Sequence, residues 1–483
     1  MKTCSSTLPL AAPQRNDVVV TASKTAQPAN KNKLVAPGCC PAILIAAPAS
    51  GQGKTTVACA LARLHTRQGR KVRVFKCGPD FLDPYWLALA SGSPVHQLDL
   101  WMTGEADCAQ RLHEAALEAD LIIVEGVMGL FDGQPSAADL AQRFGLSVLA
   151  VIDASAMAGT FGALVWGLQH YRDNLTFAGV LANRVASPGH AVMLQDGLRD
   201  PAQWLGALMR NESLKLPERH LGLVMDHELG DAMARLDAAA DALENTLLGQ
   251  MTADDLHAWA VTFEASDALD APAQDVPPGA LQGQTIAVAR DAAFCFLYAA
   301  NLDCLQAMGA RLAYFSPLVD DALPPCDALW LPGGYPELHG ETLSANVAMK
   351  ACIAAHVQAG KPVWAECGGM MALFDQITNA NGSTHAMWGV LPGHVTMQKR
   401  LAALGPQQLS VAGATLRGHT FHYSTCATPL EVATRTQAAP GRTLRGEGEA
   451  LYVSGSVKAS YFHAWFASSP AAVARLFLKD AHD

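Results

Sequence analysis

The sequence predicts an α/β protein made of two tandem, doubly wound domains. Short runs rich in valine, isoleucine and leucine alternate with helix-length segments, first over residues 42–185 and again over residues 284–367. Continuous apolar strands joined by helical crossovers indicate parallel sheets covered by helices on both faces. A chain of 483 residues is also too long for one ordinary hydrophobic core, which favours two domains.

The order of the predicted elements sets the domain boundaries. In the first domain, residues 39–270, strands are expected at 42–48, 71–78, 121–127, 147–155 and 177–185. In the second domain, residues 284–483, they are expected at 284–291, 311–317, 328–334 and 361–367, with later β-like segments. The stretch from about 200 to 280 is more helical and polar, and its Pro- and Asp-rich end predicts a linker at 271–283. Residues 1–38 are small, polar and basic, and are expected to form a disordered tail.

Composition and charge exclude several classes of protein. The formal net charge is −10 with acids and bases interspersed, which argues against a nucleic-acid-binding surface. No apolar stretch reaches the length of a membrane span, and the first residues lack the apolar core of a secretory signal. The 12 cysteines show neither C-x-x-C pairs nor the regular spacing of a disulfide framework. These features predict a cytoplasmic protein in a reducing compartment.

A glycine-rich segment, AAPASGQGKTT, follows the first predicted strand and opens a helix, which is the context that a phosphate-binding loop requires. Gly51 and Gly53 allow backbone N–H groups to close around phosphate oxygens, and Lys54 would bridge the β- and γ-phosphates. Thr55 would hold Mg²⁺. The predicted ATP-binding residues of this loop are Ser50, Gly51, Gln52, Gly53, Lys54, Thr55 and Thr56.

Charged residues follow the next two strands. KCGPDFLDPYW supplies Lys76, Asp80 and Asp83, and EGVMGLFDG supplies Glu125 and Asp132. The carboxyl ends of parallel strands meet at one edge of a sheet, so these carboxylates can hold Mg²⁺ and position an acceptor for phosphoryl transfer. Asp80 and Asp83 could instead cap turns beside the neighbouring prolines. Glu125, directly after a buried strand, is expected to bind metal or position water.

The second domain carries a thiol on a sharp turn. In KPVWAECGGMMALF, Cys367 ends a strand and precedes two glycines and an apolar helix, as in a nucleophile elbow. Backbone N–H groups at Gly368, and at Gly334 of LPGGYPELHG, would stabilise an oxyanion. The helix N-terminus is expected to lower the pKa of the thiol. A thiol nucleophile also needs a base, and the candidates are His463, in SYFHAWF, and His339, His419 and His422.

These motifs together resemble a known family. LPGGYPE, AECGGMM and SYFHAWF resemble the class I glutamine amidotransferase domain, which has a flavodoxin-like fold. With GQGKTT, KCGPDFLDPYW, EGVMGLFDG, NRVASPGH (183–190) and LPERHLGL (216–223), the chain resembles the cobyrinate a,c-diamide synthases of cobalamin biosynthesis. In that family a P-loop NTPase-like domain, similar to dethiobiotin synthetase, precedes the glutaminase domain. The resemblance covers residues 40 to 480.

The resemblance implies a ligase with two half-reactions. Cys367, helped by His463, would release ammonia from glutamine. In the other domain, MgATP would phosphorylate a peripheral carboxylate of the corrin ring, and ammonia would displace the phosphate, first at the c and then at the a side chain. The implied partners are therefore glutamine, ATP and a corrin polycarboxylate, with no nucleic acid and no membrane. The sequence leaves a homodimer open.

The resemblance also assigns individual residues. Thr55 and Glu125 would be the Mg²⁺ ligands, and Asn183 would recognise the base of ATP. The residues expected to line the acyl-phosphate site are Lys76, Asp80, Asp83 and Asp132. Two residues after His463 the chain has Trp465, where many class I glutaminases have an acid. The sequence therefore predicts a Cys–His dyad whose third member is not identified.

Other functions share parts of this pattern. The same reaction on hydrogenobyrinate, the cobalt-free ring, uses every motif quoted above, and a nickel-sirohydrochlorin diamidating relative is similar. Cobyric acid synthase is less similar at EGVMGLFDG and KCGPDFLDP. A non-catalytic P-loop regulatory or partitioning ATPase with a dead glutaminase scaffold is the alternative from another class. The presence of both Cys367 and His463 argues against it.

Overall fold

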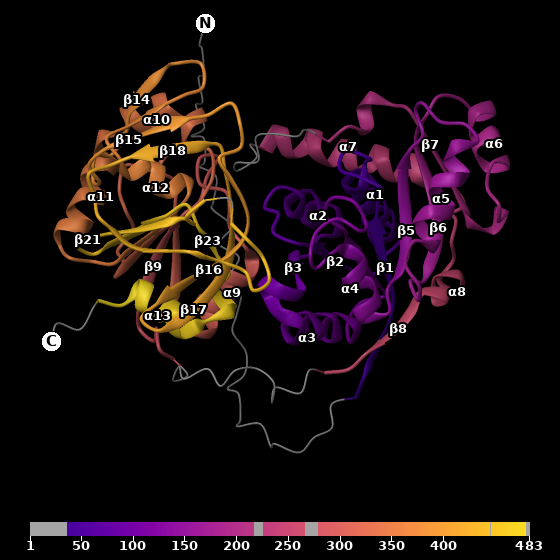
Figure 1. The fold of residues 1–483 in the computed structure, drawn as a ribbon, viewed down its shortest axis with the longest axis horizontal. Helices are drawn as coiled ribbons and strands as arrows, with labels where there is room; N and C mark the ends of the chain where they lie inside the picture. Colours follow the sequence, from indigo (N-terminus) through magenta and orange to yellow (C-terminus); the bar gives the residue numbers. More distant parts are fainter. Residues whose placement is uncertain (1–35, 217–225, 266–278, 445, 480–483) are drawn as a thin grey trace, which may run out of the picture. The chain divides into compact units, whose positions relative to one another are not determined.

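A mostly parallel sheet forms the centre of the N-terminal half of the chain. The computed structural model describes residues 36–216, 226–265, 279–444 and 446–479. In this part the first sheet has the order β3-β2-β4-β1-β5-β6-β7, and β8 pairs with β1 (Figure 1). Its strands are β1 (Gly38–Ala46), β2 (Val72–Cys77), β3 (His96–Leu98), β4 (Leu121–Glu125), β5 (Ser147–Asp153), β6 (Phe177–Val185), β7 (Trp204–Met209) and β8 (Ala260–Phe263).

Helices cover both faces of this sheet, as the sequence predicts. Successive side chains of a strand point to opposite faces: in β1, Ile43 and Ile45 belong to one apolar core, and Leu44 and Ala46 belong to the other. The first core is completed by α1 (Lys54–Arg67), α2 (Asp83–Ser91) and α7 (Asp226–Glu244), of which α1 and α7 lie side by side (Figure 1). The second is completed by α3 (Glu105–Ala116), α4 (Ala137–Phe144), α5 (Thr160–His170) and α6 (Pro188–Asp196).

The stretch from about 200 to 280 differs from the helical segment that was predicted. It contains α7 and the short α8 (Ala253–Leu256), but also strands β7 and β8. Strand β8 runs antiparallel to the first residues of β1, from Gly38↔Phe263 to Pro41↔Ala260. Strand β1 therefore starts at Gly38, the last residue of the predicted tail. Both added strands are only partly buried. Strand β8 is short, whereas the apolar run WLGALM of β7 was a signal that the prediction did not use.

A second sheet forms the centre of the C-terminal half. Its order is β10-β9-β11-β12-β22-β21-β19, and its first five strands are parallel. The strands are β9 (Thr285–Ala289), β10 (Arg311–Phe315), β11 (Ala328–Leu331), β12 (Val363–Glu366), β19 (Val432–Arg435), β21 (Ala450–Ser454) and β22 (Val457–Ser460). Helices α10 (Gly340–Ala345), α11 (Val347–Gln358) and α12 (Gly368–Leu373) contribute to one core, and α9 (Ala299–Ala307) and α13 (Pro470–Phe477) contribute to the other. The α/β prediction with two doubly wound domains is confirmed.

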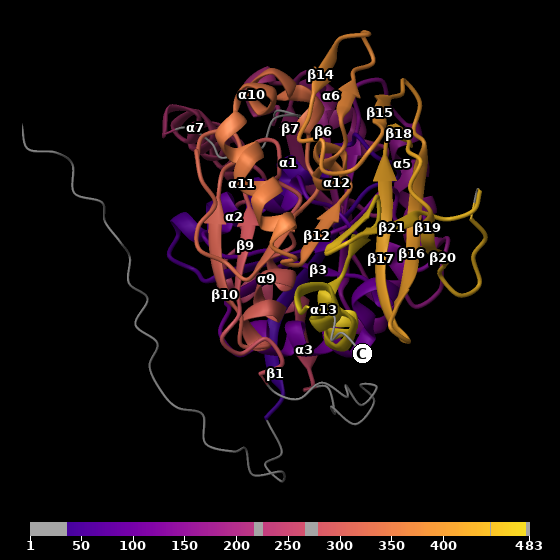
Figure 2. The same ribbon diagram turned by 90° about the vertical axis from the view of Figure 1, so that its left-hand side faces the viewer.

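Two smaller sheets complete this half. One has the order β14-β13-β15-β18 and the other β20-β16-β17-β23. Figure 2 shows β16 and β17 as a long antiparallel hairpin. The strands are β13 (Gln376–Thr378), β14 (Thr384–Ala386), β15 (His394–Met397), β16 (Ala403–Val411), β17 (Ala414–His422), β18 (Ser424–Ala427), β20 (Gln437–Ala438) and β23 (His463–Ala464).

Residues Pro37–Asp483 form one compact unit, and several contacts join its two sheet systems. A small apolar cluster contains Met102 and Phe81 from the first half together with Tyr298 and Trp465 from the second. Nη2 of Arg417 donates to the carbonyl of Thr103 at 3.1 Å. The loop after β2 and the segment that begins α3 therefore contact the C-terminal half.

Several sequence predictions fall outside the described residues. These are the tail up to residue 35, most of the linker at 271–283, and residues 217–223 of LPERHLGL. In the described ranges, no helix has the length and apolar character needed to cross a membrane.

Candidate active site

The phosphate loop joins β1 to α1. Gly51 and Gly53 have φ angles of 78° and 96°, a left-handed conformation that strongly favours glycine. Gly53 also caps the N-terminus of α1, where free N–H groups and the helix dipole attract phosphate. A β-carbon on Gly53 would lie 2.2 Å from Nδ2 of Asn183. Glycine is thus needed here both for the backbone angle and for the close approach of the β6 side chain.

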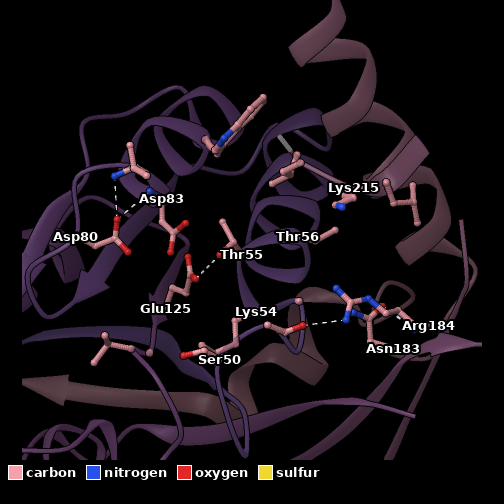
Figure 3. A pocket seen from close by; sticks show the side chains of 18 of the residues that line it. Ser50, Lys54, Thr55, Thr56, Asp80, Asp83, Glu125, Asn183, Arg184 and Lys215 are labelled. Carbon is pink, nitrogen blue, oxygen red and sulfur yellow. Dashed lines mark hydrogen bonds between the residues drawn. The ribbon is translucent and has the colours of Figure 1, made fainter. Parts of the chain in front are cut away.

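A cavity of about 610 Å³ opens over this loop. The predicted site residues on its wall are Ser50, Gly51, Gly53, Lys54, Thr55, Thr56, Lys76, Asp80, Asp83, Glu125 and Asn183. Figure 3 shows the acids Asp80, Asp83 and Glu125 at one end, and Asn183 and Arg184 at the other, with Lys54 and Thr55 between them. Gln52 is not on the wall; its Oε1 accepts from the backbone N–H of Asp153 at 2.8 Å.

Lys54 is held over the loop by backbone carbonyls. Its Nζ donates to the carbonyl of Met128 at 2.6 Å and to that of Ala49 at 3.3 Å. Burial, followed by the positive charge of Lys76, lowers the pKa of Lys54. Both effects disfavour the charged form of Lys54. Negatively charged phosphate oxygens would stabilise that form.

Glu125 lies at the centre of a buried polar chain. Its Oε1 accepts from Oγ1 of Thr55 at 2.7 Å and from Nζ of Lys76 at 3.0 Å, while its buried Oε2 has no hydrogen-bond partner among the described residues. Burial raises the pKa of Glu125 to about 7, and Lys76 opposes that shift. The Thr55 hydroxyl and the unpartnered carboxylate oxygen are hard oxygen donors, which suit Mg²⁺. The residues present thus fit the predicted metal.

Such an ion would need further ligands. The described ranges contain no group of three or more His, Cys, Asp or Glu side chains that could hold a metal ion by themselves. Mg²⁺ commonly takes only one or two protein oxygens and completes its shell with phosphate oxygens and water. The geometry therefore fits a metal that arrives with the nucleotide.

Lys76 links the acids of the β2 loop to Glu125. Its Nζ donates to Oδ2 of Asp83 at 2.5 Å and lies 3.6 Å from Oδ2 of Asp80. Burial alone would lower the pKa of Lys76, but the carboxylates of Glu125, Asp80 and Asp83 raise it. Oδ1 of Asp80 accepts from the backbone N–H groups of Leu82 and Asp83. Asp80 thus caps a turn and also faces the cavity. A turn-capping role and a role in the active site are therefore compatible for this residue.

Asp132 has a different position from the one expected. Its Oδ2 accepts from the backbone N–H of Gly129 at 2.8 Å, and its side chain is not on the cavity wall. The turn that it closes includes Met128, whose carbonyl accepts from Lys54. Asp132 therefore supports the loop that positions Lys54, and its role at the acyl-phosphate site stays a prediction.

The far end of the cavity carries cations that the sequence analysis missed. Nδ2 of Asn183 donates to the carbonyl of Gln52 at 2.9 Å. Arg184, at a φ of 56°, donates to the carbonyl of Gly51 at 2.9 Å and to Oδ2 of Asp153 at 2.6 Å. Arg210 and Lys215 also line this end. Arg184 lies in the motif NRVASPGH but was given no role there, and Arg210 and Lys215 lie outside every quoted motif.

The thiol turn has the strained backbone of a nucleophile elbow. Cys367 has a φ of 44° and a ψ of −108° between β12 and α12, a conformation that costs a non-glycine residue roughly 1–3 kcal/mol. A β-carbon on Gly368 would lie 2.8 Å from the backbone N of Gly334, and one on Gly334 would lie 2.1 Å from the carbonyl oxygen of Ala293. The two predicted oxyanion glycines therefore have their backbones in close contact beside the thiol.

His463 is the candidate base that lies next to this turn. A β-carbon on Gly333 would lie 2.4 Å from Cε1 of His463, and the backbone N–H of Cys367 donates to Ser460, three residues before the histidine. The other candidates have different surroundings. His422 lies 3.1 Å from Glu449, while His419 stacks on the His463 ring at 5.0 Å. His339 begins α10.

Burial changes the protonation expected for the pair. The sequence analysis expected the helix N-terminus to lower the pKa of Cys367, but burial and then the charge of Glu337 raise it. Burial, with a smaller contribution from His419 and His422, holds the pKa of His463 well below its usual value. These two shifts favour the neutral thiol and the neutral imidazole, so the thiol would transfer its proton as it attacks.

Two further residues of this site were not identified from the sequence. Glu366 directly precedes Cys367 and is 1% exposed, with Oε2 at 3.9 Å from Nδ1 of His463. The ring of Phe81, from the β2 loop of the other half, lies 5.1 Å from the ring of His463. Glu366 is the glutamate of the segment AECGG, so its position next to Cys367 could have been noted from the sequence. No local sequence pattern could indicate that Phe81 contacts His463.

Two family models match the chain, one in each of the two predicted domains. Residues 43–224 match the CobQ/CobB/MinD/ParA nucleotide binding domain, and residues 285–471 match the CobB/CobQ-like glutamine amidotransferase domain.

Relatives named as a,c-diamide synthases are similar over most of the chain. A hydrogenobyrinate a,c-diamide synthase of Stutzerimonas stutzeri is 55% identical over 437 residues, which cover 90% of this chain and 98% of the relative. One of Pseudomonas aeruginosa is 55% identical over 437 residues, with 90% and 97% covered. A cobyrinate a,c-diamide synthase of Herminiimonas arsenicoxydans is 49% identical over 441 residues, with 90% and 96% covered.

Proposed function

The chain belongs to the family of cobyrinate and hydrogenobyrinate a,c-diamide synthases, and we propose that it converts the a and c side-chain carboxylates of cobyrinate into amides. The reaction uses ATP and nitrogen from glutamine. The observation that carries the proposal is the polar chain from Thr55 through Glu125 and Lys76 to Asp83, at one end of a phosphate-binding cavity. The acceptor would be a carboxylate placed between these residues and the γ-phosphate.

In the first half-reaction, a carboxylate oxygen of the corrin acid attacks the γ-phosphorus of ATP, and the bond to the β-phosphate oxygen breaks. Lys54 stabilises the negative charge that moves onto the leaving oxygens. Lys76 has three acids around it, which hold its ammonium at the acid-lined end of the cavity. Ammonia then attacks the acyl carbon of the mixed anhydride, and inorganic phosphate leaves.

We assign the metal of this step to Thr55 and Glu125. A bound Mg²⁺ would supply charge neutralisation of the β- and γ-phosphates. Asn183 and Arg184, at the opposite end of the cavity, are proposed to contact the nucleoside part of ATP (Figure 3).

In the second half-reaction, Sγ of Cys367 attacks the carboxamide carbon of glutamine as its proton passes to His463. The backbone N–H groups at Gly334 and Gly368 stabilise the oxyanion. The C–N bond then breaks, the nitrogen takes the proton from His463, and ammonia leaves. Water hydrolyses the thioester to glutamate and restores the thiol.

One specific observation favours hydrogenobyrinate as the alternative substrate. The two relatives at 55% identity are named for hydrogenobyrinate, whereas that at 49% is named for cobyrinate. The deciding experiment is mass spectrometry of the products formed from each ring acid with ATP, Mg²⁺ and glutamine. A gain of two amides on cobyrinate is the expected result. Amidation of hydrogenobyrinate alone would move the assignment to the cobalt-free ring, and amidation of neither would overturn the proposed function.

A further inference from the structure

The base of the glutaminase site lacks the acid that usually orients it. The position two residues after His463 holds Trp465, which is fully buried. Nδ1 of His463 is buried and has no hydrogen-bond partner among the described residues. A buried, unpaired ring nitrogen is unfavourable, and a catalytic histidine needs a fixed tautomer to act as a base.

Glu366 occupies the place from which this acid can act. In the parallel pair β12–β22, Glu366 lies opposite Ser460, and the chain continues from Ser460 directly to His463. Strand pairing therefore brings an acid and a histidine together although nearly a hundred residues separate them. Oε2 of Glu366 is 3.9 Å from Nδ1 of His463, and the two side chains are 2% and 1% exposed.

The other oxygen of this carboxylate is already fixed. Oε1 of Glu366 accepts from Nε1 of Trp364 at 2.6 Å and from the backbone N–H of Ala464 at 3.4 Å. Ala464 is the residue after His463, so the carboxylate holds the backbone beside the base as well as facing its ring. The 3.9 Å separation exceeds a hydrogen bond, as is common for catalytic contacts before the substrate binds.

We propose that Glu366 is a positioning residue for the glutaminase reaction: its carboxylate accepts a hydrogen bond from Nδ1–H of His463 and leaves Nε2 free to take the thiol proton. This inference rests on the proposed function only through its glutaminase half. The remaining neighbours of the ring cannot replace Glu366, because Phe81 and Phe296 are apolar and His419 stacks on the ring face. His422 is engaged by Glu449.

The charges at this site favour a stronger interaction between Glu366 and His463 in the transition state. Burial raises the pKa of Glu366 to about 8, against the donation from Trp364 and Ala464. When His463 takes the thiol proton, a positive ring lies beside this acid, and an opposite charge at this distance favours the carboxylate. The interaction is thus stronger in the transition state than in the resting enzyme, which is the condition for raising kcat.

The test compares Glu366→Gln with Glu449→Gln. Glutamine at 366 keeps an acceptor for Trp364 but presents an NH₂ to Nδ1, which favours the Nε2–H tautomer. Glu449→Gln removes another buried partner of a histidine in the same half, His422, without touching His463. We expect Glu366→Gln to lower kcat for glutamate release by roughly 10²- to 10⁴-fold, as for the loss of a triad acid, with KM for glutamine little changed. Corrin amidation with added ammonia should persist, and Glu449→Gln should retain both activities.

The ¹⁵N shifts of His463 give a readout that a merely structural role would not change. Above pH 8, where Glu366 is ionised, His463 of the wild-type full-length protein should carry its proton on Nδ1, and Glu366→Gln should move it to Nε2. Glutamate release by Glu366→Gln at the wild-type rate would overturn the proposal. An Nε2–H tautomer in the wild type would also overturn it, and that measurement does not depend on how well the variant folds. Glu366→Asp should keep the Nδ1–H tautomer and recover part of kcat. If the wild type fails to amidate a corrin acid but releases glutamate, the proposed function fails and this inference does not.

Discussion

Replacing Phe81 by alanine should separate the two half-reactions. The Phe81 ring comes from the loop that carries Asp80 and Asp83, and it stacks on Phe296 at 4.9 Å and on Tyr298 at 4.2 Å. It also contacts the imidazole rings of the glutaminase half. An occupied acceptor site can thus act on the glutaminase histidine through this side chain.

The size of the effect follows from these contacts. An aromatic pair contributes about 0.5–1.5 kcal/mol beyond its buried area, so the two stacked pairs contribute about 1–3 kcal/mol. A coupling free energy of that size corresponds to roughly a 5- to 150-fold change in activity. The loop itself should survive the substitution, because the carboxylate of Asp80 accepts from the N–H groups of Leu82 and Asp83 and does not depend on the ring.

The assay measures glutamate release with and without ATP and corrin acid, together with corrin amidation driven by added ammonia. In Phe81→Ala we expect the stimulation of glutamate release to fall by roughly 5- to 150-fold, while ammonia-driven amidation stays unchanged. Trp166→Ala is a matched control, since it removes an exposed aromatic ring that stacks on His170 in the same half. Full stimulation in Phe81→Ala would refute the coupling. A parallel loss of ammonia-driven amidation would show that the ring positions the acceptor instead.

Three further predictions test other parts of the molecule. Cys367→Ala should abolish glutamate release but keep amidation with added ammonia, measured by product mass spectrometry; equal loss of both would contradict the division of labour. Glu125→Gln should abolish amidation with either nitrogen source, because it removes the charge of the proposed Mg²⁺ ligand and of the partner of Lys76, and ATP hydrolysis at the wild-type rate would contradict this role. Burial, followed by the charge of Arg70, lowers the pKa of His65 to about 4 from 6.5. The unfolded chain binds the proton first, so this residue stabilises the fold above pH 6.5. It should lose about 3 kcal/mol of that stability as pH falls toward 4. Urea unfolding of wild type and His65→Gln checks the slope, and an identical pH dependence would contradict it.

The sequence was most informative where function and local geometry coincide. The glycines of the phosphate loop and the Cys367 turn need unusual backbone angles, and such requirements leave a visible pattern. Strand β8 was missed because it has only 4 residues, of which one is buried, whereas the continuous apolar run WLGALM of β7 was visible in the sequence but lay in a stretch that was predicted to be helical. Arg184 was missed for another reason: its role depends on strand order, which places β6 beside β5. Sequence position contains no such information.

The two halves of the site differ in polarity, and this difference suits the transfer of nitrogen. Around Lys76 there are three carboxylates and an ammonium, so this part of the site is strongly polar and charged. Around His463 the neighbours are mainly aromatic, and burial lowers the pKa of the histidine itself. The same desolvation disfavours ammonium relative to ammonia, so nitrogen released beside His463 stays uncharged and nucleophilic. Phe81 contacts His463 from a loop whose acids pair with Lys76. In the proposed reaction, nitrogen released at the apolar site would therefore emerge beside the loop that is expected to hold its acceptor.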